Sequence, residues 1–436
     1  MTRTAVAVVT FCILSSGIAD AQPVLSPTGN WEGLIERQGA ALTVRIDFRT
    51  EAGAVTARIT SESQRVLEYP LDKMAYASPK IHWEWGDSAP LVFDGVVSAQ
   101  GISGIFRDGS ETGTFSLKPV SVLAPPPYRR QDITFRNGDV VLSGTLLRPR
   151  TPGPHPGIVF MHGSGPESRW GTSFFLADRF ARAGIAALVF DKRGVGQSTG
   201  DWTTIDDQEL AEDYVNAVRF LQHQSGVSPT RVGLYGHSQG GTISPLIASR
   251  PGVVAFVIAA AAIGTGPLYE QDIYRTRNEL SDKGLTGDDL SRAIAFYTLW
   301  LNAVRTGQGI DEYEQASANS KGEKWFAGLG IPPRDHWLWR WYPPIGNFDP
   351  LPLWASVKVP VLLIYGERDR NTPVGPSLRG ISTALRAAGN RDYTPIIVPG
   401  AVHNLTIQPE AGEPFFWWYA APGYTELLTA WVHARF

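Results

Sequence analysis

Ser238 lies in a short glycine-rich stretch whose spacing is typical of a catalytic serine. The sequence GHSQG at 236–240 fits the pattern G-x-S-x-G and directly follows an apolar run. In this pattern a tight turn between a strand and a helix lifts the serine hydroxyl clear of the backbone, and residues without bulk are needed on both sides of it. Glycines and serines also form ordinary turns, so the rest of the chain must decide whether Ser238 is a nucleophile.

A nucleophilic serine needs a general base, and the base needs an acid that orients it and stabilises its protonated form. Two later loops offer these groups. Glu367 and Asp369 follow the apolar run VPVLLIYG, and His403 follows the run YTPIIVPG. In an open α/β sheet such loops lie at the carboxyl ends of the strands, so these side chains should meet at one edge. The order along the chain predicts a triad of Ser238, an acid at Glu367 or Asp369, and His403 as the base.

The elements that must position these residues are strands alternating with helices. Between several of the apolar runs lie helical periods, such as the one after the acidic turn at Asp206 and Asp207. Short apolar runs of this kind are typical of strands buried on both faces of a parallel sheet. We therefore predict a doubly wound, mostly parallel α/β fold over residues 131–436, which begins with a hairpin turned at Asn137-Gly138. The apolar runs are 157–163, 186–191, 231–236, 253–262, 359–366 and 393–400.

One interval is far longer than a crossover between strands requires. Residues 264–352 are predicted to form a helical cap over the site, with Thr286 and Asp289 as a capping box for one of its helices. Trp337, Trp339, Trp341 and Tyr342 cluster in this cap, and five aromatic residues cluster at 415–419. Such clusters line an apolar acyl pocket or, more commonly, pack a cap onto the core.

The part of the chain before the α/β region has a different pattern. Residues 22–120 alternate apolar and polar side chains, as in ALTVRIDFR and KIHWEW. This alternation predicts a small antiparallel β-barrel-like domain in which one face of the sheet is buried and the other is exposed to solvent. The proline-rich linker 121–130 would separate it from the α/β part. A packing or shielding role is expected for this domain, with ligand or surface binding as the alternative.

The first residues are predicted to be a secretory signal peptide. Residues 1–21 contain Arg3, an apolar run from Ala5 to Leu14 and the small-x-small end Ala-Asp-Ala. The run is too short to span a bilayer, and no small residue precedes Cys12 as a lipid anchor would require. Cleavage after Ala21 would export the protein to the periplasm or the medium without any cysteine, and hence without a disulfide or thiol nucleophile.

Composition excludes several partners. The 436 residues are 43% hydrophobic and 19% charged with a net charge of −3, so no basic field attracts nucleic acid or an anionic membrane. Metal ligands with a spacing such as H-E-x-x-H are not found, and DKRGVGQSTG lacks the G-K-[ST] ending of a nucleotide loop. The sequence therefore predicts no cofactor and no metal.

Four motifs follow one another in the second part of the chain: HGSGP, DKRGVGQSTG, GHSQGG and GERD. From about Gln131 to its end the chain resembles the α/β-hydrolase superfamily, and more narrowly the bacterial dienelactone-hydrolase-related serine esterases. The resemblance selects Asp369 over Glu367, because the family's acid stands three residues after the strand-ending glycine. It also implies an oxyanion hole made by the backbone N–H groups of Gln239 and Ser164, with Gly163 as the alternative to Ser164.

The leading expectation is an exported serine hydrolase that cleaves carboxylic esters of small molecules through an acyl-enzyme. An exopeptidase or amidase with the same triad is the first alternative, and it would need an acidic anchor for a substrate amine. A ligand-binding protein with an inert hydrolase domain is the second alternative. Candidates for this anchor among the acids of the cap are Glu270, Asp272, Glu312 and Glu314.

Other polar residues are expected to have structural roles. His162 and His237 flank the expected site and are assigned to loop packing, and Asp191 to an ion pair with Arg193. His336 is assigned to the aromatic cluster of the cap. The histidines without any partner pattern are His82, His155, His223 and His433.

Overall fold

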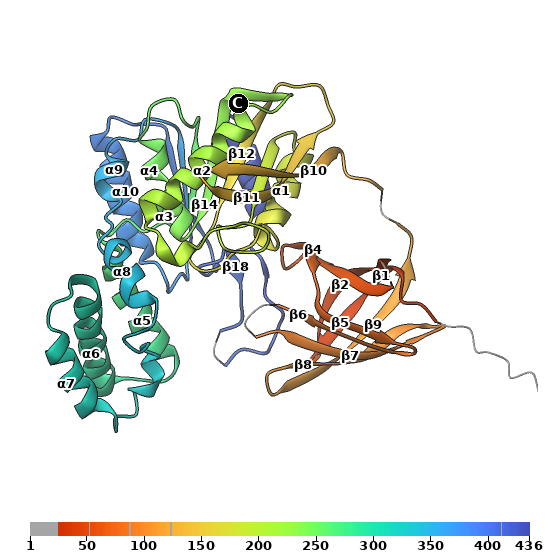
Figure 1. The fold of residues 1–436 in the computed structure, drawn as a ribbon, viewed down its shortest axis with the longest axis horizontal. Helices are drawn as coiled ribbons and strands as arrows, with labels where there is room; N and C mark the ends of the chain where they lie inside the picture. Colours follow the sequence, from red (N-terminus) through yellow and green to blue (C-terminus); the bar gives the residue numbers. More distant parts are fainter. Residues whose placement is uncertain (1–24, 52, 87–88, 123, 411) are drawn as a thin grey trace, which may run out of the picture.

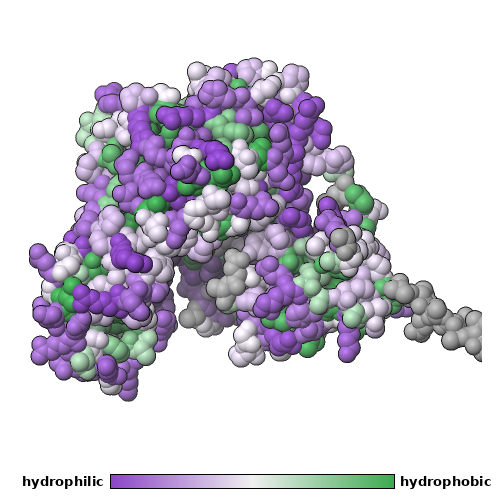
Figure 2. All heavy atoms as spheres, in the orientation of Figure 1, coloured by the Kyte–Doolittle hydropathy of each residue, from purple (hydrophilic) through white to green (hydrophobic). Residues whose placement is uncertain are grey.

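The computed structural model describes residues 25–51, 53–86, 89–122, 124–410 and 412–436. The predicted signal peptide and Cys12 lie outside these ranges. Figure 1 shows three parts: an N-terminal sheet, an α/β core, and a group of helices inserted into the core. The N-terminal sheet and the inserted helices lie on the same side of the core, and Figure 2 shows a hollow between them.

The N-terminal sheet is antiparallel throughout and nearly closed. Its order is β4-β3-β2-β1-β9-β8-β7-β6-β5, and β3 approaches β5 across the remaining gap. Inward side chains alternate with outward ones, and the interior is aromatic: the Trp83 ring stacks on Phe93 with centroids 5.1 Å apart. The predicted barrel-like architecture is therefore confirmed. The strands are β1 Gly29–Arg37, β2 Ala40–Glu51, β3 Ala54–Ser61, β4 Val66–Pro70, β5 Asp72–Ala77, β6 Lys80–Trp85, β7 Leu91–Ser98, β8 Gly101–Asp108 and β9 Glu111–Val120.

The α/β core is built on an eight-stranded sheet with the order β10-β11-β13-β12-β14-β15-β16-β17. The first hairpin is antiparallel and turns where Asn137 pairs with Val140, as predicted. β11 also pairs antiparallel with β13, and the remaining pairs are parallel. The strands are β10 Tyr128–Asn137, β11 Val140–Pro149, β12 His155–Met161, β13 Ala186–Phe190, β14 Val227–His237, β15 Val257–Ala260, β16 Val361–Gly366 and β17 Tyr393–Val398.

Helices cover both faces of this sheet because its strands bury side chains on both sides. On one face Ile158 and Phe160 pack among α1 and α11, and on the other Val159 and Met161 pack with α2, α3, α4 and α10. Asp206 caps α2 by accepting a hydrogen bond from the N–H of Glu209. The helices are α1 Thr172–Arg182, α2 Asp207–Gln222, α3 Gln239–Ile243, α4 Pro245–Ala248, α10 Val374–Ala387 and α11 Tyr424–His433.

The insertion between β15 and β16 is helical, and we call its helices α5–α9 the cap. α6 begins where it was predicted to, but the side chain of Thr286 makes no capping hydrogen bond, so the predicted capping box is wrong. No helix in the part of the chain that the structure describes is long and apolar enough to cross a membrane. The cap helices are α5 Leu268–Asp282, α6 Gly287–Thr306, α7 Ile310–Ser320, α8 Leu338–Gly346 and α9 Leu351–Trp354.

The segment near the C-terminus, residues 408–418, connects the core to the N-terminal sheet. It lies between the short paired strands β18 Thr406–Ile407 and β19 Tyr419–Ala420. The Trp417 indole N–H donates to the carbonyl of Ala40 at 3.2 Å, and the Ala420 N–H donates to the carbonyl of Ser63 at 2.7 Å. The sequence analysis expected these aromatic residues to line an acyl pocket or to pack the cap. In the structure Trp417 and Phe415 contact the β domain instead.

Candidate active site

Ser238 stands at the turn between β14 and α3 in a strained conformation. Its φ of 54° lies in the left-handed region that non-glycine residues rarely adopt. The turn is so tight that a Cβ on Gly236 would lie 2.4 Å from the backbone of Gly240. Strain of this kind persists where the surrounding structure imposes it, commonly at functional sites. The turn has the geometry expected of a nucleophile elbow.

The predicted acid and base lie beside this serine. His403 Nε2 is 3.1 Å from Ser238 Oγ, and His403 Nδ1 is 2.9 Å from Asp369 Oδ2. The three residues follow β14, β16 and β17, whose carboxyl ends share one edge of the parallel sheet. The structure thus brings Ser238, His403 and Asp369 into one hydrogen-bonded chain.

The carboxylate of Asp369 is held in place from its other side. Its Oδ1 accepts hydrogen bonds from the N–H groups of Asn371 and Thr372, both at 2.8 Å, and the side chain is fully buried. Glu367, the other acid on this loop, instead accepts a hydrogen bond from the N–H of Gly400 at 2.8 Å. The geometry therefore places Asp369, and not Glu367, against the histidine.

Two backbone N–H groups near Ser238 are suited to receive an oxyanion. Gln239 is the first residue of α3, where N–H groups have no partner within the helix. In the loop after β12 the Gly163 N–H is already engaged, because it donates to Glu167 Oε2 at 2.8 Å. The Ser164 N–H makes no hydrogen bond within the described ranges. This difference favours Ser164 over Gly163 as the second donor.

A buried lysine that the sequence analysis did not identify bonds the loop after β12. Lys192 Nζ donates to the carbonyl oxygens of Gly163 and Gly165, both at 3.1 Å, and to Gln239 Oε1 at 3.3 Å. It therefore joins the two segments that carry the N–H groups. Burial lowers the pKa of Lys192 to about 8. In the sequence, the feature that could have drawn attention to Lys192 is its position two residues after the end of β13, in the motif DKRG.

Gln239 is held from its other side by an acid at the start of α2. Its Nε2 donates to Asp207 Oδ1 at 2.8 Å. Burial raises the pKa of Asp207 to about 7. The side chain beside the nucleophile is thus fixed between a buried cation and a buried acid.

We expect Lys192→Met to lower kcat at this site by about tenfold, less than the loss of a backbone N–H that stabilises an oxyanion, because Lys192 acts only through the loop that it positions. The wild-type rate should decline as the pH rises through about 8, where the amine loses its charge and retains two N–H donors for three acceptor oxygens. pH profiles of kcat test this. The decline should be absent in Lys192→Met and present in the control Lys283→Met, an exposed residue after α5. An identical alkaline limb in Lys192→Met would contradict the assignment.

The two histidines that flank the site are held as packing groups. His162 is buried, with Nδ1 bonded to Tyr214 Oη at 2.8 Å and Nε2 to the Phe190 carbonyl at 2.7 Å, and burial lowers its pKa to about 4. His237 Nε2 donates to the carbonyl of His403 at 3.0 Å, and burial beside His403 lowers its pKa to about 3. Both imidazoles are therefore neutral near pH 7.

Two structural assignments from the sequence were wrong. Asp191 forms an ion pair with Arg169 at 2.8 Å, not with Arg193 two residues later, which pairs with Asp213 at 2.7 Å. The chain turns at 192–195, where the Val195 N–H donates to the carbonyl of Lys192, so Asp191 and Arg193 do not share one side as they would in an extended strand. The partner of Asp191 therefore comes from another loop. His82 does have a partner: its Nδ1 is 2.8 Å from Asp94 Oδ1, directly across two antiparallel strands.

A cavity of about 710 Å³ opens over Ser238 and His403 beneath the cap. Trp337, Trp341 and Tyr342 of the aromatic cluster line it, while Trp339 packs against Trp300 inside the cap. The cluster thus both lines the pocket and packs the cap. Within the described residues there is no group of three or more His, Cys, Asp or Glu side chains that could hold a metal ion.

Comparison with known proteins identifies the class. The model of the alpha/beta hydrolase family matches residues 158–412, which include Ser238, Asp369 and His403. The chain therefore belongs to the alpha/beta hydrolase family, as the four motifs predicted. The narrower likeness to dienelactone-hydrolase-related enzymes stays a prediction.

Individual relatives include esterases. Esterase EstD of Thermotoga maritima is 27% identical over 320 residues, which are 70% of this chain and 68% of the relative. Quorum-quenching protein AidA of Acinetobacter baumannii is 33% identical over 141 residues, 32% of this chain and 46% of the relative. An esterase structure from Pyrococcus furiosus superposes with a TM-score of 0.44 at 19% identity, covering 65% of this chain and 88% of that one. The chain is thus an α/β hydrolase with an esterase, EstD, among its relatives.

Proposed function

We propose that this protein is a serine hydrolase that cleaves carboxylic esters of small molecules through an acyl-enzyme. The observation that carries the proposal is the hydrogen-bonded chain from Ser238 Oγ through His403 to the buried carboxylate of Asp369. A strained turn that exposes the hydroxyl and the esterase EstD among the relatives support it.

In the proposed reaction Ser238 Oγ attacks the acyl carbon while His403 Nε2 takes its proton. The oxyanion of the tetrahedral intermediate accepts hydrogen bonds from the N–H groups of Gln239 and Ser164. His403 then protonates the departing alcohol and leaves an acyl-Ser238 ester. Water, activated by the same imidazole, attacks this ester and releases the acid, which restores the serine. Asp369 holds the imidazole and stabilises its protonated form.

The cap favours an ester over a peptide with a free amine. Of the acids considered above as an anchor, Glu270, Asp272, Glu312 and Glu314, Asp272 lines the cavity over Ser238. Its carboxylate already pairs with Arg275 at 2.9 Å and accepts a hydrogen bond from the Tyr342 hydroxyl. A carboxylate that is already paired binds a substrate ammonium group only weakly. The aromatic wall of the cavity suits an apolar acyl group instead.

Export to the periplasm or the medium is also part of the proposal. It rests on the pattern of residues 1–21, which has the charged start, apolar run and small-residue end of a signal peptide. Amino-terminal sequencing of the protein recovered from the source cells would test it, with Gln22 expected as the first residue.

A substrate panel tests the proposed class of reaction. The purified protein should hydrolyse p-nitrophenyl acetate and butyrate, and it should cleave aminoacyl p-nitroanilides far more slowly, because the cap acid that lines the cavity, Asp272, is already paired with Arg275. Initial rates at equal concentrations of the two substrate sets measure this. Faster cleavage of the anilides would replace the esterase proposal with an exopeptidase, and no cleavage of either set would reject a hydrolase of this kind.

A further inference from the structure

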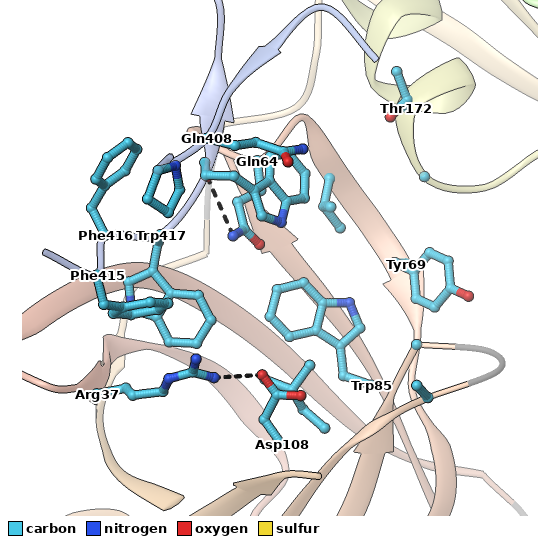
Figure 3. Close-up of a pocket in the computed structure, with 17 residues that line it drawn as sticks. Arg37, Gln64, Tyr69, Trp85, Asp108, Thr172, Gln408, Phe415, Phe416 and Trp417 are labelled. Carbon is cyan, nitrogen blue, oxygen red and sulfur yellow. Dashed lines mark hydrogen bonds and ion pairs between the residues drawn. The ribbon is translucent and has the colours of Figure 1, made fainter. Parts of the chain in front are cut away.

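An aromatic pocket lies between the N-terminal sheet and the α/β core. It has a volume of about 520 Å³. Figure 3 shows the rings of Trp85, Tyr69, Phe415 and Trp417 arranged around it, with Thr172 at the start of α1 on its far side. Trp85 ends β6 and Tyr69 belongs to β4, whereas the other two rings come from the segment 408–418. The pocket therefore exists only because the β domain packs against the core.

Few polar groups accompany these rings, and most of them are already bonded. Arg37 pairs with Asp108 at 2.6 Å, and its guanidinium lies 4.2 Å from the centre of the Phe415 ring. The Gln64 amide donates to the carbonyl of Trp418 at 3.4 Å (Figure 3). Pockets that are mainly aromatic, with a few fixed polar groups, are typical sites for small organic molecules. The rings offer flat faces on which an aryl group of a ligand can pack.

A second cavity, of about 480 Å³, lies between this pocket and the site around Ser238. With the aromatic pocket it shares Thr172 and Gln408 among its lining residues. With the cavity over the triad it shares Glu167, His237 and Asn404. The three cavities thus lie one after another from the nucleophile to Trp85, and each shares wall residues with the next.

The position of this series relative to His403 indicates which half of an ester would enter it. In the proposed reaction His403 hands its proton to the departing alcohol, so the alcohol lies on the side of this histidine. His237 and Asn404, which line the start of the series, are the residue before the nucleophile and the residue after the base. The cavity beneath the cap then remains for the acyl group.

We propose that the aromatic pocket is a subsite for an aryl ring at the far end of the alcohol part of the ester substrate. The inference rests on the proposed function and narrows its substrate class to esters of extended alcohols that end in an aromatic ring. The N-terminal sheet then contributes directly to substrate binding through Trp85 and Tyr69. Remote binding of this kind positions an ester for attack without touching its reacting atoms.

Two series of acetate esters test the subsite: esters of ω-phenylalkanols, from phenylethyl to phenylhexyl, and esters of n-alkanols of equal chain length. Hydrolysis is followed by acid release. In the wild-type protein the ratio of kcat/KM between the phenyl and the plain ester should rise to about tenfold once the ring reaches the pocket. Because each ratio is taken within one variant, a general loss of activity cancels.

The variants are chosen to close or open the pocket without disturbing the core. Thr172→Trp places an indole at an exposed position that lines both the second cavity and the aromatic pocket, and Phe415→Ala removes one half-buried ring. Both should reduce the ratio toward one. The control Thr383→Trp changes an exposed threonine on α10 that lines none of the three cavities, and it should keep the wild-type ratio.

Three outcomes would overturn the subsite: a ratio near one in the wild type, a ratio that persists in Thr172→Trp, or an advantage found only when the phenyl ring is on the acyl side. If no ester is hydrolysed, the proposed function fails, and calorimetric binding of phenylhexyl acetate to Ser238→Ala decides the subsite separately. Binding that Thr172→Trp abolishes in the Ser238→Ala background supports the pocket. An absence of binding to Ser238→Ala rejects it.

Discussion

Ser238→Ala is expected to abolish ester hydrolysis, with kcat for p-nitrophenyl acetate lowered by a factor on the order of 10⁶. The serine hydroxyl is the only group that His403 Nε2 contacts at hydrogen-bond distance among the described residues, so its removal leaves the base without a nucleophile. Rates are measured with the colorimetric ester, and covalent labelling with a fluorophosphonate is measured on the same samples. Both signals should disappear.

The matched control is Ser249→Ala, which removes a hydroxyl at the end of α4 and lies outside the cavity over the triad. It should keep the wild-type rate and the wild-type labelling. Labelling that persists in Ser238→Ala would show that another residue is the nucleophile. Unchanged folding of both variants, checked by circular dichroism, separates a loss of chemistry from a loss of structure.

Asp369→Asn should lower kcat by about 10⁴-fold while the fold is retained. The amide oxygen can still accept the N–H groups of Asn371 and Thr372, but the amide nitrogen would then face His403 Nδ1. An amide N–H cannot accept from the Nδ1–H of the imidazole and instead favours the wrong tautomer. It also cannot stabilise the protonated imidazole.

Glu367→Gln is the comparison that makes this prediction specific. Glu367 lies two residues earlier on the same loop. Among the described contacts its carboxylate accepts only the Gly400 N–H, and an amide oxygen can accept the same hydrogen bond. Its activity should stay within about twofold of the wild type, since such surface substitutions change little. If Glu367→Gln lost more activity than Asp369→Asn, the acid of the triad would be Glu367.

Much of the candidate site could be predicted because its signals are local. A G-x-S-x-G stretch implies a tight turn, and the structure shows why, since a side chain on Gly236 would collide with Gly240. Apolar runs that end in loops mark the carboxyl ends of strands, so residues far apart in the chain were expected at one sheet edge. For the expected oxyanion donor in the loop after β12, the motif resemblance favours Ser164 but leaves Gly163 as an alternative. The hydrogen bond from Gly163 to Glu167 is a contact between side chain and backbone that no pattern encodes.

The errors share a physical cause. The partner of Asp191 is Arg169, from a different loop, and the partner of His82 is Asp94, from a neighbouring strand. Lys192 was overlooked because its three acceptor oxygens come from two segments that only the folded chain brings together. Contacts of this type depend on register and on the direction of each side chain.

The α/β core, the barrel-like sheet before it, and the order of Ser238, an acid and His403 along the chain could all be predicted from the sequence. Each of these follows from periodicity or from a turn, which involve residues close together in the chain. That the aromatic residues at 415–418 meet the N-terminal sheet instead of the cap, and that Asp191 pairs with Arg169, follows only from the folded chain. Those outcomes depend on how separate parts of the chain pack, because a pocket between two domains has no counterpart in the local pattern of either one.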